Sequence, residues 1–180
     1  MSELSDKEIL DLFNSNPNYA FNLLVNKFQK QIYWHVRRIV IDHDDANDVV
    51  QNTFIKIWRN ISDFRNESKL YTWIYRIATN ESITFLKQKR SLFFIPLINV
   101  EKELSNKIDD THFFSGDEIQ KKLQKAILCL PQKQRIVFNM KYYDNMKYED
   151  MEEILGTSIG ALKASYHIAV KKIEKYLTEH

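Results

Sequence analysis

The sequence contains few of the residues that build tight turns. Glycine and proline each occur three times in 180 residues, too few for the many turns of a β-sandwich or a closed barrel. A single cysteine, Cys129, excludes an intramolecular disulfide framework and a multi-cysteine zinc site, and it fits a reducing cytoplasm. No run of about 18 apolar residues occurs and the first residues are polar, so neither a membrane span nor a signal peptide is expected. An all-α, cytoplasmic protein is the first expectation.

Apolar residues recur at intervals of three and four along the amino-terminal half, which is the spacing of amphipathic helices. The pattern predicts a short helix that ends near Pro17. Three long helices follow, with apolar stripes over residues 21–39, 46–61 and 70–86. Asp45 is the expected N-cap of the helix that begins at residue 46. These four helices are expected to form a compact bundle over residues 5–90.

The helical pattern fails over residues 91–117, which contain a proline and an acidic stretch. We interpret this segment as a flexible linker. Helical spacing resumes at Ile119, and Pro131 separates two further helices. A helix around residues 148–155, the turn Gly156-Thr157-Ser158 and a last helix over residues 162–177 complete a second small domain, residues 118–180.

Charge is unevenly distributed, although 26 basic and 24 acidic residues leave a net charge of only +2. Residues 42–52 contain four aspartates and no lysine or arginine, and residues 101–118 contain six acids and two lysines. Residues 65–90 contain six basic residues and two acids, and residues 158–177 contain four lysines and one acid. Because binding responds to the local field, the two basic segments are candidates for contact with DNA, and the first acidic segment suits a basic protein surface.

The carboxyl-terminal pattern of helix, glycine-containing turn, serine N-cap and basic helix is typical of a helix-turn-helix. The last helix has an apolar face through Leu162, Tyr166, Ala169, Ile173 and Leu177. The opposite face presents Gly160, Ala164, His167, Ile168, Lys171 and Lys175, and Lys163 and Lys172 lie at its flanks. Such a helix fits the major groove of duplex DNA. An ordinary helical hairpin with a solvated lysine face would show the same pattern.

Aromatic and basic residues alternate around the start of the predicted helix at residues 70–86. Lys69, Trp73, Arg76 and Asn80 share one side of it, and Phe64 lies shortly before. Aromatic faces for stacking, cations for the backbone and an amide for a base edge suit unpaired bases. The alternative is that Trp73 belongs to an ordinary bundle core and that the basic residues form a solvated face.

Both halves resemble one known family. The run Asp45-Ala46-Asn47-Asp48-Val49-Val50-Gln51-Asn52-Thr53-Phe54, with Trp58, Phe64-Arg65 and residues 71–80, resembles region 2 of the extracytoplasmic-function (ECF) sigma factors. Leu130-Pro131, Tyr148-Glu149-Asp150-Met151 and Ile154-Leu155-Gly156, continuing through Gly160, Lys163, His167 and Ala169, resemble their region 4. The match covers nearly the whole chain, in the order of the family.

The resemblance implies a non-catalytic specificity subunit of bacterial RNA polymerase, a transcription initiation factor. Region 2 would bind the polymerase clamp helices through Asp45, Asp48, Gln51, Asn52 and Ile55. It would melt and read the −10 element through Phe64, Arg65, Ser68, Lys69, Thr72, Trp73, Arg76 and Asn80. Region 4 would read the −35 duplex through Ser158, Gly160, Ala161, Lys163, Ala164, His167, Ile168 and Lys171. The acidic linker would run toward the RNA path, and an anti-sigma factor is an expected partner besides core polymerase and promoter DNA.

Some positions depart from the family pattern. Ser165, Ile168 and Val170 stand where the family usually has arginines, so weak affinity for isolated −35 DNA is expected. Glu152 stands where a small alanine usually packs inside the helix-turn-helix. Either a rotated helix or an outward-pointing glutamate would accommodate it.

Two other classes of protein share parts of the pattern. A stand-alone helix-turn-helix transcription regulator would bind duplex DNA without polymerase. An enzyme could gather a divalent metal on Asp42, Asp44, Asp45 and Asp48, but a helix amino terminus explains these acids better through its dipole. The five histidines, at positions 35, 43, 112, 167 and 180, show no ligand spacing, so neither a metal nor a cofactor is expected.

Overall fold

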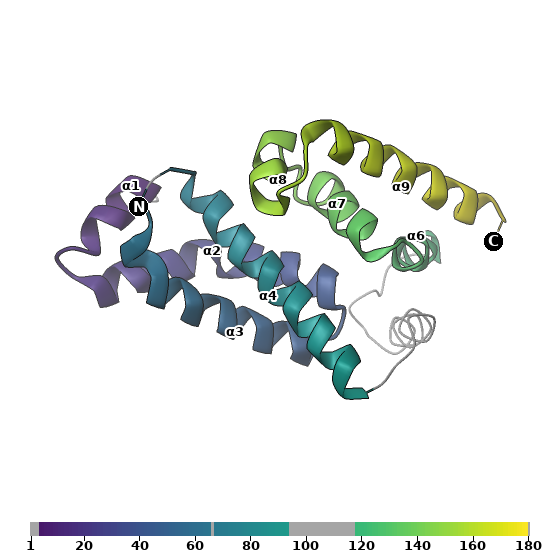
Figure 1. The fold of residues 1–180 in the computed structure, drawn as a ribbon. Helices are drawn as coiled ribbons and strands as arrows, with labels where there is room; N and C mark the ends of the chain where they lie inside the picture. Colours follow the sequence, from purple (N-terminus) through teal and green to yellow (C-terminus); the bar gives the residue numbers. More distant parts are fainter. Residues whose placement is uncertain (1–3, 66, 94–117, 180) are drawn as a thin grey trace. The chain divides into compact units, whose positions relative to one another are not determined.

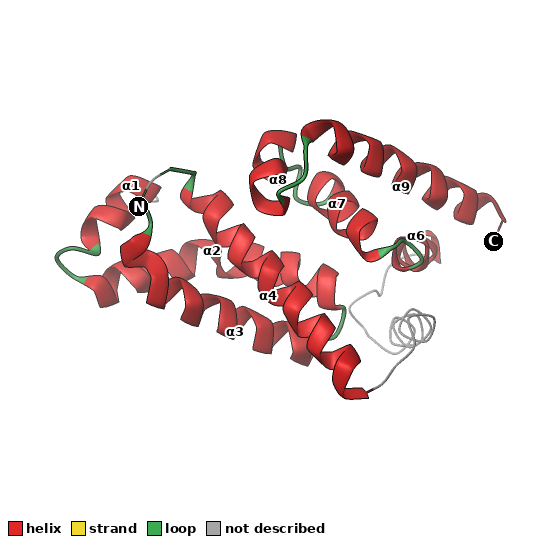
Figure 2. Ribbon diagram, in the orientation of Figure 1, coloured by secondary structure: helices red, strands yellow, loops and turns green. Residues whose placement is uncertain are grey.

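The structure, a computed structural model, describes residues 4–65, 67–93 and 118–179, and all regular elements within these ranges are helical (Figure 2). The elements, coloured in chain order in Figure 1, are α1 (Asp6–Leu12), α2 (Pro17–Val40), α3 (His43–Asn60), the short 3-10 helix η1 (Ile61–Asp63), α4 (Leu70–Phe93), α6 (Glu118–Leu128), α7 (Gln132–Tyr142), α8 (Tyr148–Leu155) and α9 (Ile159–Glu179). The predicted all-α class is confirmed. None of the helices in the described ranges combines the length and hydrophobicity that a membrane span requires.

The chain divides into two compact units, Met1–Ser82 and Ile83–His180. This division falls inside α4, which runs without interruption to Phe93. Residues 91–93, the first three of the predicted linker, continue this helix. The rest of the predicted linker lies outside the described residues, and the domain limits at residues 90 and 118 stay a prediction.

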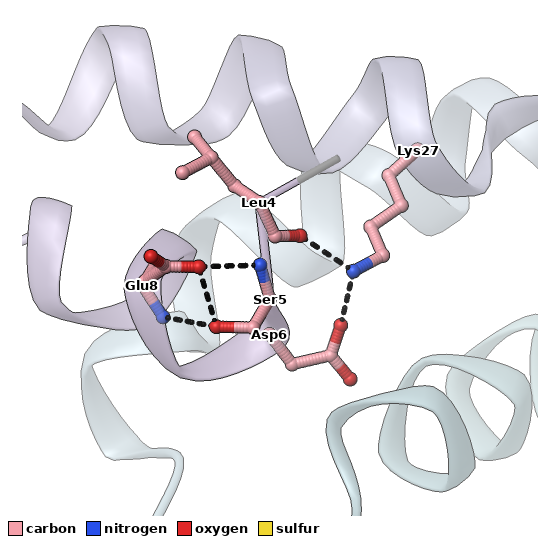
Figure 3. A network of polar contacts seen from close by, with 5 residues as sticks. All are labelled: Leu4, Ser5, Asp6, Glu8 and Lys27. Atoms are coloured by element: carbon pink, nitrogen blue, oxygen red, sulfur yellow. Dashed lines mark hydrogen bonds and ion pairs between the residues drawn. The ribbon is translucent and has the colours of Figure 1, made fainter. Parts of the chain in front are cut away.

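A capping box starts α1, and Lys27 joins this start to α2 (Figure 3). The Ser5 hydroxyl accepts from the backbone N–H of Glu8 at 3.3 Å, and the Glu8 carboxylate accepts from the Ser5 backbone N–H at 2.7 Å. The hydrogen bonds to Ser5 hold the pKa of Glu8 below its ordinary value. Lys27 of α2 donates to the Leu4 carbonyl at 2.9 Å and pairs with Asp6 at 2.7 Å. The capping box thus stabilises the start of the short helix, and the Lys27 contacts attach it to α2.

The core of the first unit lies between α2, α3 and α4. Fully buried apolar side chains come from all three helices: Leu24, Ile32 and Val36 from α2, Val49 and Ile57 from α3, and Ile74 and Ala78 from α4. His35 of α2 is also buried and hydrogen-bonds the Thr79 hydroxyl of α4 at 2.8 Å. Lys56 of α3 forms an ion pair with Glu81 of α4. Polar bonds therefore tie α4 to both neighbouring helices.

The start of α3 corrects one prediction. Asp42, not Asp45, is the N-cap: its Oδ1 accepts from the backbone N–H groups of Asp44 at 3.0 Å and Asp45 at 3.2 Å. Asp45 lies within the first helical turn. The helix begins earlier because Asp42 already provides an extended backbone and a carboxylate acceptor. The turn before it contains Ile41, whose φ of 72° is rare for a β-branched residue.

The second unit has its own core in the helices after residue 117. It consists of Ala126, Ile127, Leu130, Phe138, Ala169 and Ile173, with Leu123, Tyr143, Tyr166, Val170 and Tyr176 packed against it. The predicted apolar face of α9 is therefore confirmed at Ala169 and Ile173, and Leu162 is fully buried too. Leu177, predicted on the same face, is instead 37% exposed near the end of the helix.

Candidate polymerase and DNA interfaces

The acidic helix α3 presents a polar stripe to solvent. Asp48, Gln51, Asn52 and Ile55 are exposed and Asp45 is half-buried. Their spacing of three and four residues places them along one side of the helix, while Ala46, Val49, Phe54 and Ile57 are buried on the other. The structure thus brings together all five residues predicted for polymerase contact. The stripe has three carboxylates, with Asp44, and no lysine or arginine before Lys56.

An open apolar groove lies beside this stripe and was not predicted. It has a volume of about 570 Å³ and is lined by Asn18, Phe21, Asn22, Gln51, Phe54, Ile55 and Trp58. The rings of Phe21 and Trp58 meet edge to face, with centroids 4.9 Å apart. Ile55 and Trp58 are each 41% exposed. The groove shares Gln51 and Ile55 with the acidic stripe, so the two features form one continuous surface.

The aromatic residues of the second predicted site gather at the start of α4. Phe64 follows η1, and its ring lies 5.2 Å from that of Trp73 between centroids. Both side chains are half-buried. Tyr71 and Tyr75 pair one turn away at 4.3 Å, with Tyr75 itself buried. Phe64 and Trp73 therefore form a partly exposed aromatic pair at the start of α4.

The polar residues predicted for the same site lie on the surface, with the exception of Thr72. Arg65, Lys69 and Asn80 are exposed, and Ser68 and Arg76 are half-buried. Thr72 is 0% exposed, so its side chain belongs to the core and cannot be on the surface with the others. Apart from Thr72, the predicted residues frame the Phe64–Trp73 pair with two exposed cations and one exposed amide.

The turn between α8 and α9 is built from local hydrogen bonds. Gly156 ends α8 in the left-handed conformation, with φ 60° and ψ 33°, and its N–H donates to the Glu152 carbonyl at 2.9 Å. The Ser158 hydroxyl accepts from the Ala161 N–H at 3.4 Å. The exposed Glu152 carboxylate accepts from the Ile159 N–H at 3.2 Å. Glu152 therefore points outward and caps α9, and this contact was missed because it joins residues across the turn.

The predicted reading face of α9 is exposed. The exposed residues include Ser158, which directly precedes α9, and seven residues of the helix itself: Gly160, Ala161, Lys163, Ala164, His167, Ile168 and Lys171. The Lys163 ammonium lies 5.7 Å from the centroid of the Tyr148 ring, and Lys141 lies 5.1 Å from the same ring. Burial of Tyr148, together with nearby Tyr166, raises its pKa above the ordinary value. Tyr148 is therefore uncharged at neutral pH, and its ring lies close enough to Lys163 and Lys141 for cation–π interactions.

The described residues contain no group of three or more histidine, cysteine, aspartate or glutamate side chains placed to hold a metal ion. The aspartates near the start of α3 instead serve the helix, since Asp42 caps it and Asp44 and Asp45 lie in its positive first turn.

Comparison with known proteins agrees with this arrangement. Residues 24–92 match the model of sigma-70 region 2, and residues 120–173 match that of sigma-70 region 4. The RNA polymerase sigma-H factor of Pseudomonas aeruginosa is 28% identical over 195 residues, covering 98% of this chain and 96% of the relative. The ECF RNA polymerase sigma-E factor of Escherichia coli K12 is 30% identical over 186 residues, covering 97% and 95%.

Two solved structures have the same fold. CnrH in complex with the cytosolic domain of CnrY matches with a TM-score of 0.71 at 21% identity, over 97% of both chains. The sigma factor RpoE in complex with the anti-sigma factor NepR from Bartonella quintana matches with a TM-score of 0.67 at 20% identity, over 88% of this chain and 96% of the other.

The chain belongs to the sigma-70 family of RNA polymerase sigma factors. Within that family it is of the ECF type, as the named relatives are, and it directs transcription initiation.

Proposed function

We propose that the two units of this sigma factor divide its work among three surfaces. The acidic stripe of α3 and the adjoining groove bind core RNA polymerase. The residues around Phe64 and Trp73 read melted −10 DNA. The exposed face of α9 reads the −35 duplex. The chain contributes recognition and no catalytic chemistry of its own, and it acts in the cytoplasm, where core polymerase works.

The observation that carries this proposal is the match between the charge of each surface and its partner. The α3 stripe contains carboxylates and, from Asp44 to Ile55, no lysine or arginine, so it suits a basic protein surface and repels phosphate. The Phe64–Trp73 surface has exposed cations beside partly exposed rings. Those are the groups that bind an unpaired strand, where aromatic stacking contributes about 1–3 kcal/mol per base. This gain offsets the unstacking cost of a few kcal/mol.

For −10 contact we propose Phe64, Arg65, Ser68, Lys69, Trp73, Arg76 and Asn80. Thr72 is left out of the contact set because its side chain is buried. For polymerase contact we add Phe21 and Trp58 to Asp45, Asp48, Gln51, Asn52 and Ile55, because the groove continues the stripe. For the −35 element we propose Ser158, Gly160, Ala161, Lys163, Ala164, His167, Ile168 and Lys171.

An anti-sigma factor is the further partner that we propose. Two proteins of the same fold were solved in complex with partner proteins, one of them named as an anti-sigma factor. Such a partner would compete with polymerase if it covered the apolar groove of α2 and α3, which is open in the described part of this chain.

One experiment tests the function. The chain is incubated with bacterial core RNA polymerase and a promoter library, and run-off transcripts are sequenced. We expect transcripts that start downstream of a shared −35 and −10 pair only when the chain is present. Absence of promoter-specific initiation, together with tight duplex binding by the chain alone, would instead indicate a stand-alone helix-turn-helix regulator.

A further inference from the structure

We propose that α9 selects its −35 sequence mainly by packing against thymine methyl groups. The contact surface is Gly160, Ala164 and Ile168, here called the apolar ridge. The proposal rests on the proposed function of α9 as a DNA-reading helix and adds the class of sequence that it reads. It predicts a −35 element with A·T pairs whose thymines face the ridge.

The side chains of the apolar ridge do not contribute to the core of the second unit. Its members are four residues apart and lie on one side of α9, while Leu162, Ala169 and Ile173 fill the core from the opposite side. Ile168 is 44% exposed and is one of the few large apolar side chains with that much exposure among the described residues. An exposed aliphatic side chain among lysines contributes nothing to solubility, and it fits the C5-methyl group that only thymine presents in the major groove.

Gly160 adds an independent observation. Glycine is less favourable than alanine within a helix, so it is usually retained for a left-handed backbone or for close packing. Gly160 has neither reason, because its φ is not positive and a Cβ built on it would meet no heavy atom within 4 Å. The space above it is open within the described chain. A close approach of the helix backbone to an outside surface accounts for the missing side chain, and the methyl-lined floor of the major groove is such a surface.

The charged groups of α9 suit the backbone of DNA better than guanine. Residues 159–179 contain lysines and no arginine. The forked donor that most often reads guanine O6 and N7 is therefore absent from this helix. Lys163 and Lys171 flank the ridge and can neutralise phosphates as point charges. Glu152 already accepts from the Ile159 N–H, so the first helical turn offers few free donors.

The dimensions of the ridge limit the size of the element. Gly160 and Ile168 are eight residues apart, which corresponds to about 12 Å along a helix. Base pairs are stacked about 3.4 Å apart along the duplex axis, and a helix in the major groove is inclined to that axis, so the ridge spans at most about three to four of them. Ala164 and Ile168 should therefore meet thymines at most about two base pairs apart.

Replacing thymine by deoxyuridine tests the proposal, because it removes the methyl group and changes no hydrogen bond of the base. Holoenzyme is assembled from this chain and core polymerase on a promoter found by run-off selection, and each −35 thymine is replaced in turn. Removal of one buried methyl group should weaken promoter occupancy by about fourfold at each thymine that faces the ridge.

Two variants assign the effect to the ridge. In I168A the penalty for deoxyuridine should vanish at one position and stay at the others. L177A is the matched control, because Leu177 is an exposed aliphatic residue of the same helix on a different side, and it should keep the full pattern. G160A should keep or raise the unfolding temperature, because alanine favours the helix over glycine. It should lose −35 selectivity, since the new methyl group meets only the DNA.

Three results would count against the proposal. If −35 selectivity persists while every deoxyuridine template behaves like its thymine parent, methyl reading is wrong and the sigma function stands. If deoxyuridine weakens occupancy equally in wild type and in I168A and G160A, the methyl groups are read elsewhere. If no template supports promoter-specific initiation, the proposed function fails, and this inference fails with it.

Discussion

Replacing Glu152 by alanine should have two effects of opposite sign. The Glu152 carboxylate accepts from the Ile159 N–H at 3.2 Å, so it satisfies one of the otherwise unpaired donors at the start of α9. It also places a negative charge at the end of the helix that we assign to DNA. Removal of the side chain should therefore destabilise the helix-turn-helix and, at low salt, strengthen its contact with phosphate.

The size of the stability loss follows from the geometry. Loss of a helix cap costs about 0.5–2 kcal/mol, and here the Ser158 hydroxyl remains as a second acceptor at the same end. We therefore expect a loss of about 1 kcal/mol in the free energy of unfolding. In a unit of this size, that loss lowers the unfolding temperature by roughly 4–8 °C. E152Q keeps an oxygen acceptor without the charge and should lose about half as much.

Thermal unfolding followed by circular dichroism measures the first effect, with E153A as the matched control. Glu153 is the next residue of α8 and is also exposed, so its replacement should change stability by less than about 0.5 kcal/mol. Promoter binding by holoenzyme at rising salt measures the second effect. The increase in DNA affinity of E152Q over the unsubstituted chain should shrink as added salt reduces the Debye length below about 10 Å. Equal unfolding temperatures for E152A and E153A would refute the capping role, and unchanged DNA affinity would refute the placement of phosphate near this turn.

The other predictions concern the remaining surfaces. W73A should impair opening of the −10 region, measured by permanganate reactivity of its thymines, far more than polymerase binding, and equal loss of both would contradict base stacking. D48R should do the reverse, because it places a cation on the acidic stripe, and unchanged polymerase affinity would refute that interface. W58A should weaken polymerase binding about tenfold or more, while Y19A, which removes an exposed ring that does not line the groove, should not. The lowered pKa of Glu8 means that its contribution to capping α1 is present above the unfolded value of about 4.3 and is lost as pH falls through the lower, folded value; an NMR titration of Glu8 that shows no lowering would contradict the capping box.

Helix content and the turn before α9 could be predicted from sequence because both depend on neighbours in the chain. The burial of one face fixes the three- and four-residue spacing, and Gly156 adopts the left-handed conformation that ends α8. Helix ends are less determined, since several residues can cap. Asp42 and Asp45 both offer a carboxylate near the start of α3, and only the backbone geometry shows that Asp42 accepts the two N–H bonds.

Thr72 could not be placed from the periodicity of one helix. The sequence indicates a single buried face for α4, but this helix is bonded to α2 through His35 and Thr79 and to α3 through Lys56 and Glu81. Contact with two partners widens the buried arc until it includes Thr72. The apolar groove escaped prediction for a related reason. Its walls come from the first turns of α2 and the last turns of α3, and local spacing does not show which distant segments pack together.

The distribution of charge should keep the affinity of the free sigma factor for DNA low. In the proposed −35 contact the lysines of α9 would act as point charges on phosphate, while the Glu152 carboxylate would oppose them at the start of the same helix. The acidic stripe of α3 adds further repulsion within the other unit. A weak DNA site gains strength when polymerase holds both units over one promoter, because the second contact then becomes intramolecular. The net charge of +2 is thus the sum of acidic segments suited to a protein partner and basic segments suited to DNA. A chain with a more basic α9 should bind DNA alone and lose its dependence on polymerase.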